Sequence, residues 1–440
     1  MKHRLNALWM ALAVLLCSAV LAAVNHNAQP WYTGQWDEAS QELVYGRMLQ
    51  MQQKQRAPGG FLGVYTEAWE DVQNKYAYRE NTPQRPEDYH SYTHQPGLQG
   101  TVFAVLNKIL SVWQPAGEHR EQTLYMANAT LYYAVTLSLC LAVWRALGLL
   151  PAAAWLGAAL LAPAVQCGMK NLYWCLWLWW APMLAGVALC VVCRRRGKLP
   201  PWALALPFAA SLLRCLCGFE YISTYLMLSE LPLVFCWAQD LCQKRSALPW
   251  LGRMAAAGAA GLAGFAVAMG IWLVQQRLYY GSWAQSFAGM AEAVTGRLSV
   301  TDAAVHPTSV GAVLLHYLTD PAPVLRLGPL GVTVRGLLAA VGAAFVLTAL
   351  LLAWLDRTAL RQMPPLLCAW AVGAAAPLSW MVLSKAHAEL HPHLTPMLWH
   401  FALVPASCTA LAACTVWCVR SVRAALRRSK VKPPAMAAAP

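Results

Sequence analysis

Two adjacent carboxylates, Asp37 and Glu38, stand directly after Trp36 and just beyond the first long apolar run of the chain. Neighbouring carboxylates close to low-dielectric lipid disfavour each other's charge, so one of them is suited to act as a general base, or both to hold a divalent cation. Acidic residues in the first turn of a helix also stabilise its N-terminus, which is the structural alternative. We expect Asp37 and Glu38 to be catalytic, and a divalent cation is one option for a cofactor.

A second polar cluster runs from Ser384 to His393 and packs Lys385, His387 and His391 into one short segment. Lysine and histidine are charge-assisted donors for a phosphate or diphosphate and would stabilise such a leaving group without forming a covalent intermediate. His387 and His391 would share one face if the segment is helical, so a metal site is a second option. A solvated turn is the alternative without a function.

Arg214 lies inside an apolar run, where an arginine is costly in lipid unless it faces a partner or a wet cavity. Glu220 is the nearest candidate partner, and the two form either a structural ion pair or part of a substrate site. Lys170 precedes an aromatic stretch that begins at Tyr173 and is a further candidate for binding substrate. An aromatic belt at the membrane interface is the commoner explanation of such a stretch.

The composition sets the class of protein that must position these residues. The chain has 440 residues, of which 58% are hydrophobic and 12% charged, against about 25% charged in ordinary soluble domains. Apolar runs of about 18 to 25 residues recur along it, which is the length of a membrane-spanning helix. We therefore predict an all-α integral membrane protein. The net charge of +14 comes from short basic clusters between these runs, so it indicates topology and not a nucleic-acid partner.

The apolar runs predict about ten transmembrane helices. The first is expected at residues 7–24 as an uncleaved anchor, and a signal peptide cleaved near Ala22 is the alternative. The other nine are expected at 122–144, 149–167, 173–193, 201–218, 221–240, 250–274, 331–355, 364–384 and 396–419.

Basic residues fall at every second junction, as in Arg194–Arg196 and in the tail after Arg420, which places these junctions and the N-terminus in the cytoplasm. The expected divisions are a first helix (1–24), a long outer loop (25–121), helices two to seven (122–274), a second outer loop (275–330), helices eight to ten (331–419) and a basic cytoplasmic tail (420–440). The candidate site residues then lie towards the outer face.

The first outer loop contains two segments that we predict to be interfacial helices. Between Asp37 and Gln55, Leu43, Met48 and Met51 recur at helical spacing, which is typical of an amphipathic helix lying on a membrane. Residues 98–113 are apolar but too short for an ordinary crossing, which favours a re-entrant or interfacial helix.

This layout resembles the C-class glycosyltransferases, polytopic membrane enzymes that take sugars from polyprenyl-phosphate carriers. The resemblance rests on the acidic pair Asp37-Glu38 and on the long outer loop that follows the first helix. It implies transfer of a sugar from a polyprenyl-phosphate donor to a lipid, glycan or protein acceptor, with Asp37 or Glu38 as the base. Lys385, His387 and Arg214 would neutralise the departing phosphate.

Residues 385–393 and the Gly218–Tyr221 turn also look like those of bacterial membrane proteins, a likeness that gives no activity by itself. It implies a bacterial inner membrane, whose outer face, where the topology places the candidate site, is periplasmic.

Two other functions remain open at this stage. An O-antigen polymerase or ligase also handles lipid-linked glycans outside, although its large outer loop usually comes late in the chain. A transporter or flippase of a lipid-linked glycan would place charged residues near the bilayer midplane, where Glu230 is the clear candidate. The remaining unusual charges gather towards the predicted outer face, which favours glycosyl transfer.

Overall fold

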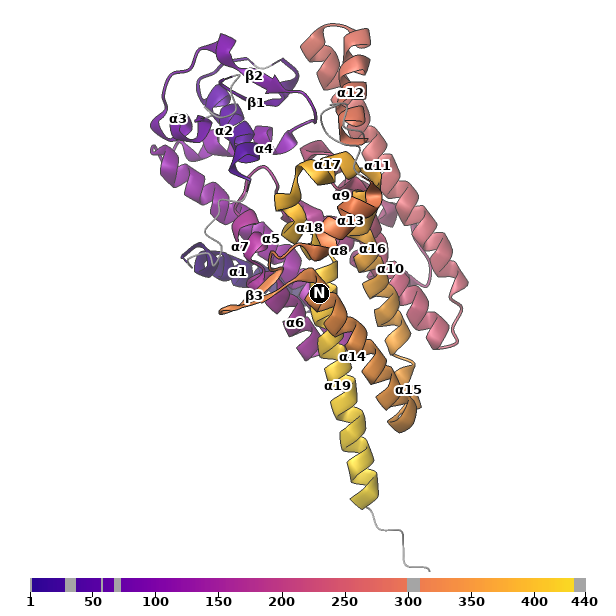
Figure 1. Ribbon diagram of the computed structural model, residues 1–440. Helices are drawn as coiled ribbons and strands as arrows, with labels where there is room; N and C mark the ends of the chain where they lie inside the picture. The colour runs from indigo at the N-terminus through magenta and orange to yellow at the C-terminus, as the bar shows by residue number, and fades with distance from the viewer. Residues whose placement is uncertain (1, 28–36, 57, 67–72, 299–308, 431–440) are drawn as a thin grey trace, which may run out of the picture.

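The computed structural model describes residues 2–27, 37–56, 58–66, 73–298 and 309–430. These residues form a predominantly helical protein in which long helices pack side by side and a small, separate group of elements sits at one end (Figure 1). The predicted all-α architecture is confirmed apart from two short hairpins, in which β1 (Leu62–Val64) pairs with β2 (His90–Tyr92) and β3 (Leu325–Leu327) pairs with β4 (Leu330–Val332).

Six helical segments of the described chain are long and apolar enough to cross a membrane. They support the prediction of an integral membrane protein. The helices concerned are α5 (Gly117–Leu147), α8 (Trp177–Arg196), α11 (Leu248–Tyr280), α14 (Val334–Leu355), α15 (Arg357–Leu360) continuing into α16 (Met363–Leu383), and α19 (Leu403–Lys430).

The count of about ten crossings is not confirmed, although every predicted run coincides with helix. Four of the runs fall on helices outside this group of six, and for two of these helices the sequence gives a reason. Ala162 and Pro163 end α6 (Leu149–Leu161) early, because proline cannot donate a helical hydrogen bond. Glu230 and Asp240 make α10 (Ile222–Cys242) less apolar. The four are α1 (Lys2–Asn27), α6, α9 (Ala205–Cys217) and α10.

The segment that we predict to be the first outer loop contains a compact unit of α2 (Glu38–Gln52), α3 (Asn74–Glu80), α4 (Leu98–Leu110) and the β1–β2 hairpin. Gly46 of α2 lies so close to the hairpin that a Cβ there would stand 2.0 Å from the carbonyl oxygen of Gly63. Leu43 and Met48 are buried inside this unit, so the apolar face of α2 packs against protein. The predicted interfacial position of α2 is therefore not confirmed.

The helix α4 differs from α2 in leaving an apolar face uncovered. Val105 and Ile109 are 45% and 48% exposed, while Phe103 and Ala104 pack inward. This amphipathic pattern is compatible with the interfacial helix predicted for residues 98–113, but no described contact places it at a membrane surface.

Shorter elements make up the rest of the described chain. They are α7 (Pro163–Gly168), α12 (Trp283–Leu298), α13 (Val310–Thr319), α17 (Lys385–Leu390), α18 (Thr395–His400) and the 3-10 turns at Pro58–Gly60, Pro86–Asp88, Pro201–Leu204 and Pro392–Leu394. The unit α2–α4 and the helix α12 lie at one end of the molecule, and α15 and the last turns of α19 at the other (Figure 1).

Basic residues that we predict to be cytoplasmic find carboxylate partners at the ends of their helices. Arg194 of α8 donates to both carboxylate oxygens of Asp240 at 2.7 and 2.8 Å, and Arg245 approaches the same carboxylate at 3.7 Å. The indole of Trp250 also donates to Asp240, at 2.6 Å. These contacts tie the ends of α8, α10 and α11 together far from the acidic pair.

Candidate functional site

Asp37 is the N-cap of α2 and has left-handed backbone angles (φ 50°, ψ 54°). Its carboxylate accepts a hydrogen bond from the backbone N–H of Ser40 at 3.4 Å, which satisfies one of the free N–H groups of the first turn. Asp37 therefore stabilises the N-terminus of α2, which is the structural role that we gave as the alternative to catalysis. Trp36, which precedes it, lies outside the described residues.

A tight turn between α7 and α8 holds Asp37 from the other side. The indole N–H of Trp174 donates to Asp37 Oδ2 at 2.5 Å, and the Asn171 side chain donates to the Asp37 carbonyl at 3.2 Å. Asn128 of α5 holds this turn by donating to the carbonyls of Met169 and Asn171 at 3.1 and 3.0 Å. Asn128 is itself buried inside the protein.

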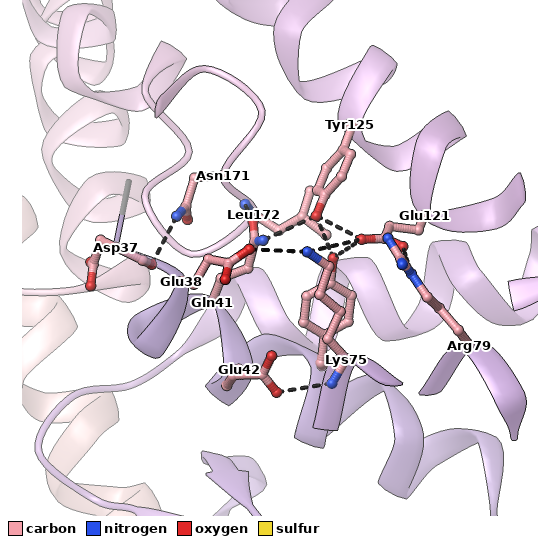
Figure 2. A network of polar contacts seen from close by, with 11 residues as sticks. Asp37, Glu38, Gln41, Glu42, Lys75, Arg79, Glu121, Tyr125, Asn171 and Leu172 are labelled. Atoms are coloured by element: carbon pink, nitrogen blue, oxygen red, sulfur yellow. Dashed lines mark hydrogen bonds and ion pairs between the residues drawn. The ribbon is translucent and has the colours of Figure 1, made fainter. Parts of the chain in front are cut away.

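Glu38 points into a different environment, a polar network that Figure 2 shows with Asp37 at its edge. The Lys75 ammonium lies 3.2 Å from Glu38 and 4.0 Å from Glu121, whose carboxylate is fully buried. Arg79, one turn beyond Lys75 on α3, donates to the other oxygen of Glu121 at 2.5 Å. Asp37 and Glu38 therefore have different partners, Trp174 and Ser40 for Asp37 and Lys75 for Glu38.

The same network reaches the turn that holds Asp37. Tyr45 and Tyr125 both donate to Glu121, the latter at 2.7 Å. Gln41 donates to the Tyr125 hydroxyl at 3.0 Å and accepts from the backbone N–H of Leu172 at 2.8 Å. Because Leu172 stands between Asn171 and Trp174, a chain of hydrogen bonds runs from Glu121 to the residues around Asp37.

Glu42 adds a third carboxylate on α2. It accepts from the backbone N–H of Lys75 at 2.9 Å. Burial raises the pKa of Glu42 to about 7, and the contacts with Lys75 lower it only in part. Near neutral pH a large fraction of Glu42 is therefore uncharged.

Arg214 and Glu220 form the predicted ion pair, with 4.0 Å between Arg214 Nη2 and Glu220 Oε2. Both residues are almost completely buried, at 2% and 3% exposure. The guanidinium also donates to the carbonyls of Gly218 and Glu220 at 3.1 and 3.2 Å, and it stacks over the ring of Trp179 at 5.3 Å. Most of its donors therefore hold the turn between α9 and α10.

Gln95 is a residue of this region that the sequence did not single out. It lies between β2 and α4 and is fully buried. Its side-chain amide donates to both oxygens of Glu220, at 2.7 and 3.0 Å, and its oxygen accepts from the Tyr173 hydroxyl at 2.5 Å. Gln95 thus links three distant segments. No local pattern marks it, because its partners are set only by the tertiary fold.

The cluster at residues 384–393 folds into α17 and the turn that follows. His387 and His391 lie on one face, with ring centroids 4.6 Å apart, as a helical turn places them. The hydroxyl of Tyr317 donates to the carbonyl of Ala388 at 2.7 Å and fixes this turn from α13. Lys385 at the start of α17 is half-buried.

Aromatic side chains lie between Asp37 and the pair His387 and His391. The ring of Tyr221 lies 6.0 Å from Trp174, which binds Asp37, and 5.8 Å from His387. Trp179 lies 5.1 Å from Tyr221 and under the guanidinium of Arg214. We call Trp174, Trp179 and Tyr221 the aromatic bridge. The structure therefore gathers Asp37, Arg214, Glu220, His387 and His391 around one aromatic bridge.

Lys170 and Lys385, the two lysines among the predicted site residues, make no hydrogen bond or ring contact with the aromatic bridge in the part of the chain that the structure describes. Lys170 lies in the turn between α7 and α8, next to Asn171, and burial lowers the pKa of its ammonium. Lys385 precedes His387 by half a turn of α17. In the described chain, neither lysine has a carboxylate within ion-pair distance. Nor does that part of the chain contain a group of three His, Cys, Asp or Glu residues arranged to hold a metal ion.

An apolar cavity of about 180 Å³ lies beside the aromatic bridge. The turn between α9 and α10 separates the two, since Phe219 faces the cavity and Tyr221 faces the histidines. Trp380 and Ser384 at the end of α16 complete the boundary, and Trp380 also contacts His387 at 5.5 Å. An apolar space thus adjoins a cluster of cationic and imidazole side chains.

Comparison with known proteins gives similarity at the level of architecture only. No protein-family model and no curated protein sequence matches the chain. The archaeal oligosaccharyltransferase AglB from Archaeoglobus fulgidus, solved with an inhibitory peptide and a dolichol-phosphate, is similar over 97% of this chain and 52% of its own, at 12% identity and a TM-score of 0.47.

The apo form of an Archaeoglobus fulgidus oligosaccharyltransferase is similar over 95% of this chain and 52% of its own, at 15% identity and a TM-score of 0.42. The chain spans about half the length of these structures. Similarity at this level does not define an activity for it.

Proposed function

We propose that this protein transfers a glycosyl group from a polyprenyl-phosphate donor to a lipid, glycan or protein acceptor at the outer, periplasmic face of a bacterial inner membrane. One observation carries the proposal: the aromatic bridge contacts both Asp37 and His387. A candidate general base and candidate phosphate ligands thereby contact the same group of buried aromatic side chains, which fixes their positions relative to one another.

The proposed reaction assigns a separate role to each group. Asp37 accepts the proton of the acceptor hydroxyl, whose oxygen forms a bond to the anomeric carbon of the sugar. The bond between that carbon and the donor phosphate oxygen breaks, and the phosphate takes the electron pair. Lys385, His387 and His391 then stabilise the phosphate charge as hydrogen-bond donors, and Lys170 is a further candidate for this role.

Arg214 and Glu220 support the site indirectly in this proposal. Their mutual contact and the bonds of Arg214 to backbone carbonyls leave the pair buried and largely satisfied. We therefore propose that they position Tyr221 at the aromatic bridge. The apolar cavity beside Phe219 would accept part of the donor's carbon chain, since it is lined almost entirely by apolar side chains.

The test is an assay of purified protein in liposomes with polyprenyl-phosphate-linked glucose, galactose or mannose and a mixture of lipid and glycan acceptors. We expect release of free polyprenyl phosphate together with a glycosylated acceptor. A donor that crosses the bilayer with its sugar–phosphate bond intact would instead identify a flippase. Polymerisation of a lipid-linked oligosaccharide, without transfer of a single sugar, would identify a polymerase.

A further inference from the structure

Lys75 stands where three carboxylates from two helices meet. Its ammonium lies 3.2 Å from Glu38 of α2 and 4.0 Å from Glu121 of α5, and its backbone N–H donates to Glu42 of α2 at 2.9 Å. The Lys75 side chain is only 25% exposed. Clustered carboxylates are typical ligands of a divalent cation, because hard cations prefer carboxylate oxygens. Here the ammonium of Lys75 lies against Glu38 and Glu121 instead.

The charges around Lys75 are close to balanced. Glu38 and Glu121 face Lys75 and Arg79, which gives two negative and two positive groups. Glu42 is the remaining carboxyl on this side of α2, and burial raises its pKa to about 7, so it contributes little charge below that pH. A divalent cation placed here would be repelled by Lys75 at close range.

Lys75 also has a route to Asp37. It holds Glu38, which is the residue after Asp37 and begins the first turn of α2. It shares Glu121 with Tyr125, and Tyr125 leads through Gln41 to Leu172 in the turn that carries Trp174. Both segments that hold Asp37 are therefore connected to the carboxylates that Lys75 binds.

We infer that Lys75 is a positioning residue that takes the place of a divalent cation in the acidic group and fixes Glu38 so that Asp37 faces the aromatic bridge. The inference rests on the proposed function for its activity readout, and its metal-binding readout is independent of that function. It predicts that glycosyl transfer needs no divalent metal.

The first experiment compares transfer by wild type, Lys75→Met and Lys75→Arg in liposomes, with Lys108→Met as a matched control on the exposed side of α4. We expect Lys75→Met to lose at least tenfold in transfer activity and Lys75→Arg to retain most of it. EDTA should leave wild-type transfer unchanged. Loss of wild-type activity in EDTA that magnesium restores, or equal activity of Lys75→Met and Lys108→Met, would overturn the inference.

The second experiment measures Mn²⁺ binding by electron paramagnetic resonance on the same purified proteins. Removing the ammonium should expose Glu38 and Glu121 to the metal, so we expect Lys75→Met to bind Mn²⁺ at least tenfold more tightly than wild type or Lys108→Met. Equal binding by all three proteins would refute the assignment of Lys75 as a substitute for a metal. If the wild type shows no glycosyl transfer, the proposed function is refuted. The Mn²⁺ measurement still tests the role of Lys75, because it does not depend on that function.

Discussion

Trp174 donates its indole N–H to the carboxylate of Asp37, although 137 positions separate the two residues in the chain. This bond joins the start of α2 to the turn between α7 and α8. Asp37 has left-handed backbone angles, which cost a non-glycine residue roughly 1 to 2 kcal/mol unless its surroundings compensate. The bonds from Trp174, Asn171 and Ser40 supply that compensation, and those from Trp174 and Ser40 fix the direction of the carboxylate.

Replacing Asp37 by asparagine should abolish transfer and leave the fold intact. Asparagine caps helices as well as aspartate does. Its single oxygen can accept from Trp174 or from Ser40 but not from both, so the variant loses one hydrogen bond in addition to the basicity. Loss of a general base typically lowers the rate by roughly a hundredfold to ten-thousandfold. The check is turnover together with the melting temperature of the purified variant. Near-normal turnover in Asp37→Asn would refute Asp37 as the base.

Glu38→Gln provides the matched comparison, because Glu38 is paired with Lys75. We expect this variant to lower turnover less than Asp37→Asn does. A larger loss of turnover in Glu38→Gln than in Asp37→Asn would indicate that Glu38, and not Asp37, is the general base.

Breaking the buried pair of Arg214 and Glu220 should mainly reduce stability. Removing one member of a buried ion pair typically costs about 3 to 5 kcal/mol, because the other charge is left without its partner. We expect Arg214→Met and Glu220→Gln each to lower the melting temperature, and the double variant to lower it less than the sum of the two. Additive losses in the double variant would show that the two side chains do not depend on each other.

The helices could be predicted from the sequence because their signal is local. Apolar runs mark each long helix, and the partner of Arg214 could be predicted because Glu220 is only six positions away. The number of crossings was less predictable. Pro163 divides one run into two shorter helices, and Glu230 and Asp240 reduce the mean hydropathy of another. Apolar runs of similar length therefore form helices that differ in length and hydropathy.

The candidate site was only partly predictable, for a reason of distance along the chain. His387 and His391 share a helical face that their spacing predicts. Lys75 binds Glu38 across 37 positions and Gln95 binds Tyr173 across 78, so both contacts depend on how the outer loop folds. The pattern of residues around Lys75 and Gln95 carries no sign of these partners.

The buried carboxyl of Glu42 should make stability depend on pH. Burial raises its pKa from 4.5 to about 7 in the folded protein, so between these values the folded state holds a proton that the unfolded chain has released. The contribution of this group to stability is therefore fully present below about pH 4 and is lost as the pH rises through about 7. We expect Glu42→Gln to become more stable relative to wild type over that interval.

The measurement is the melting temperature of wild type and Glu42→Gln in detergent at a series of pH values. Glu118→Gln is the control, because Glu118 is an exposed carboxylate in the first turn of α5. The same pH profile in wild type and Glu42→Gln would show that Glu42 does not titrate in this range.

Lys385→Ala and His387→Ala should weaken binding of a phosphate-bearing lipid more than they weaken folding. Both residues lie in the short helix α17 and are half-buried, so their truncation leaves no large cavity in the core. A charge-assisted hydrogen bond to phosphate typically contributes about 1.5 to 3 kcal/mol. Since about 1.36 kcal/mol corresponds to a factor of ten, we expect roughly a tenfold to hundredfold loss of affinity for polyprenyl phosphate.

Binding of polyprenyl phosphate and the melting temperature should be measured on the same purified variants, with His316→Ala as the control for loss of an imidazole. His316 is exposed on α13, and its ring contacts Tyr317 at 6.0 Å, so its removal tests a histidine outside the His387–His391 pair. A residue that serves only the fold would lower the melting temperature and leave the affinity of the surviving protein unchanged. Unchanged affinity in both Lys385→Ala and His387→Ala would remove the phosphate role from α17, because a donor held there must lose contacts when either side chain is truncated.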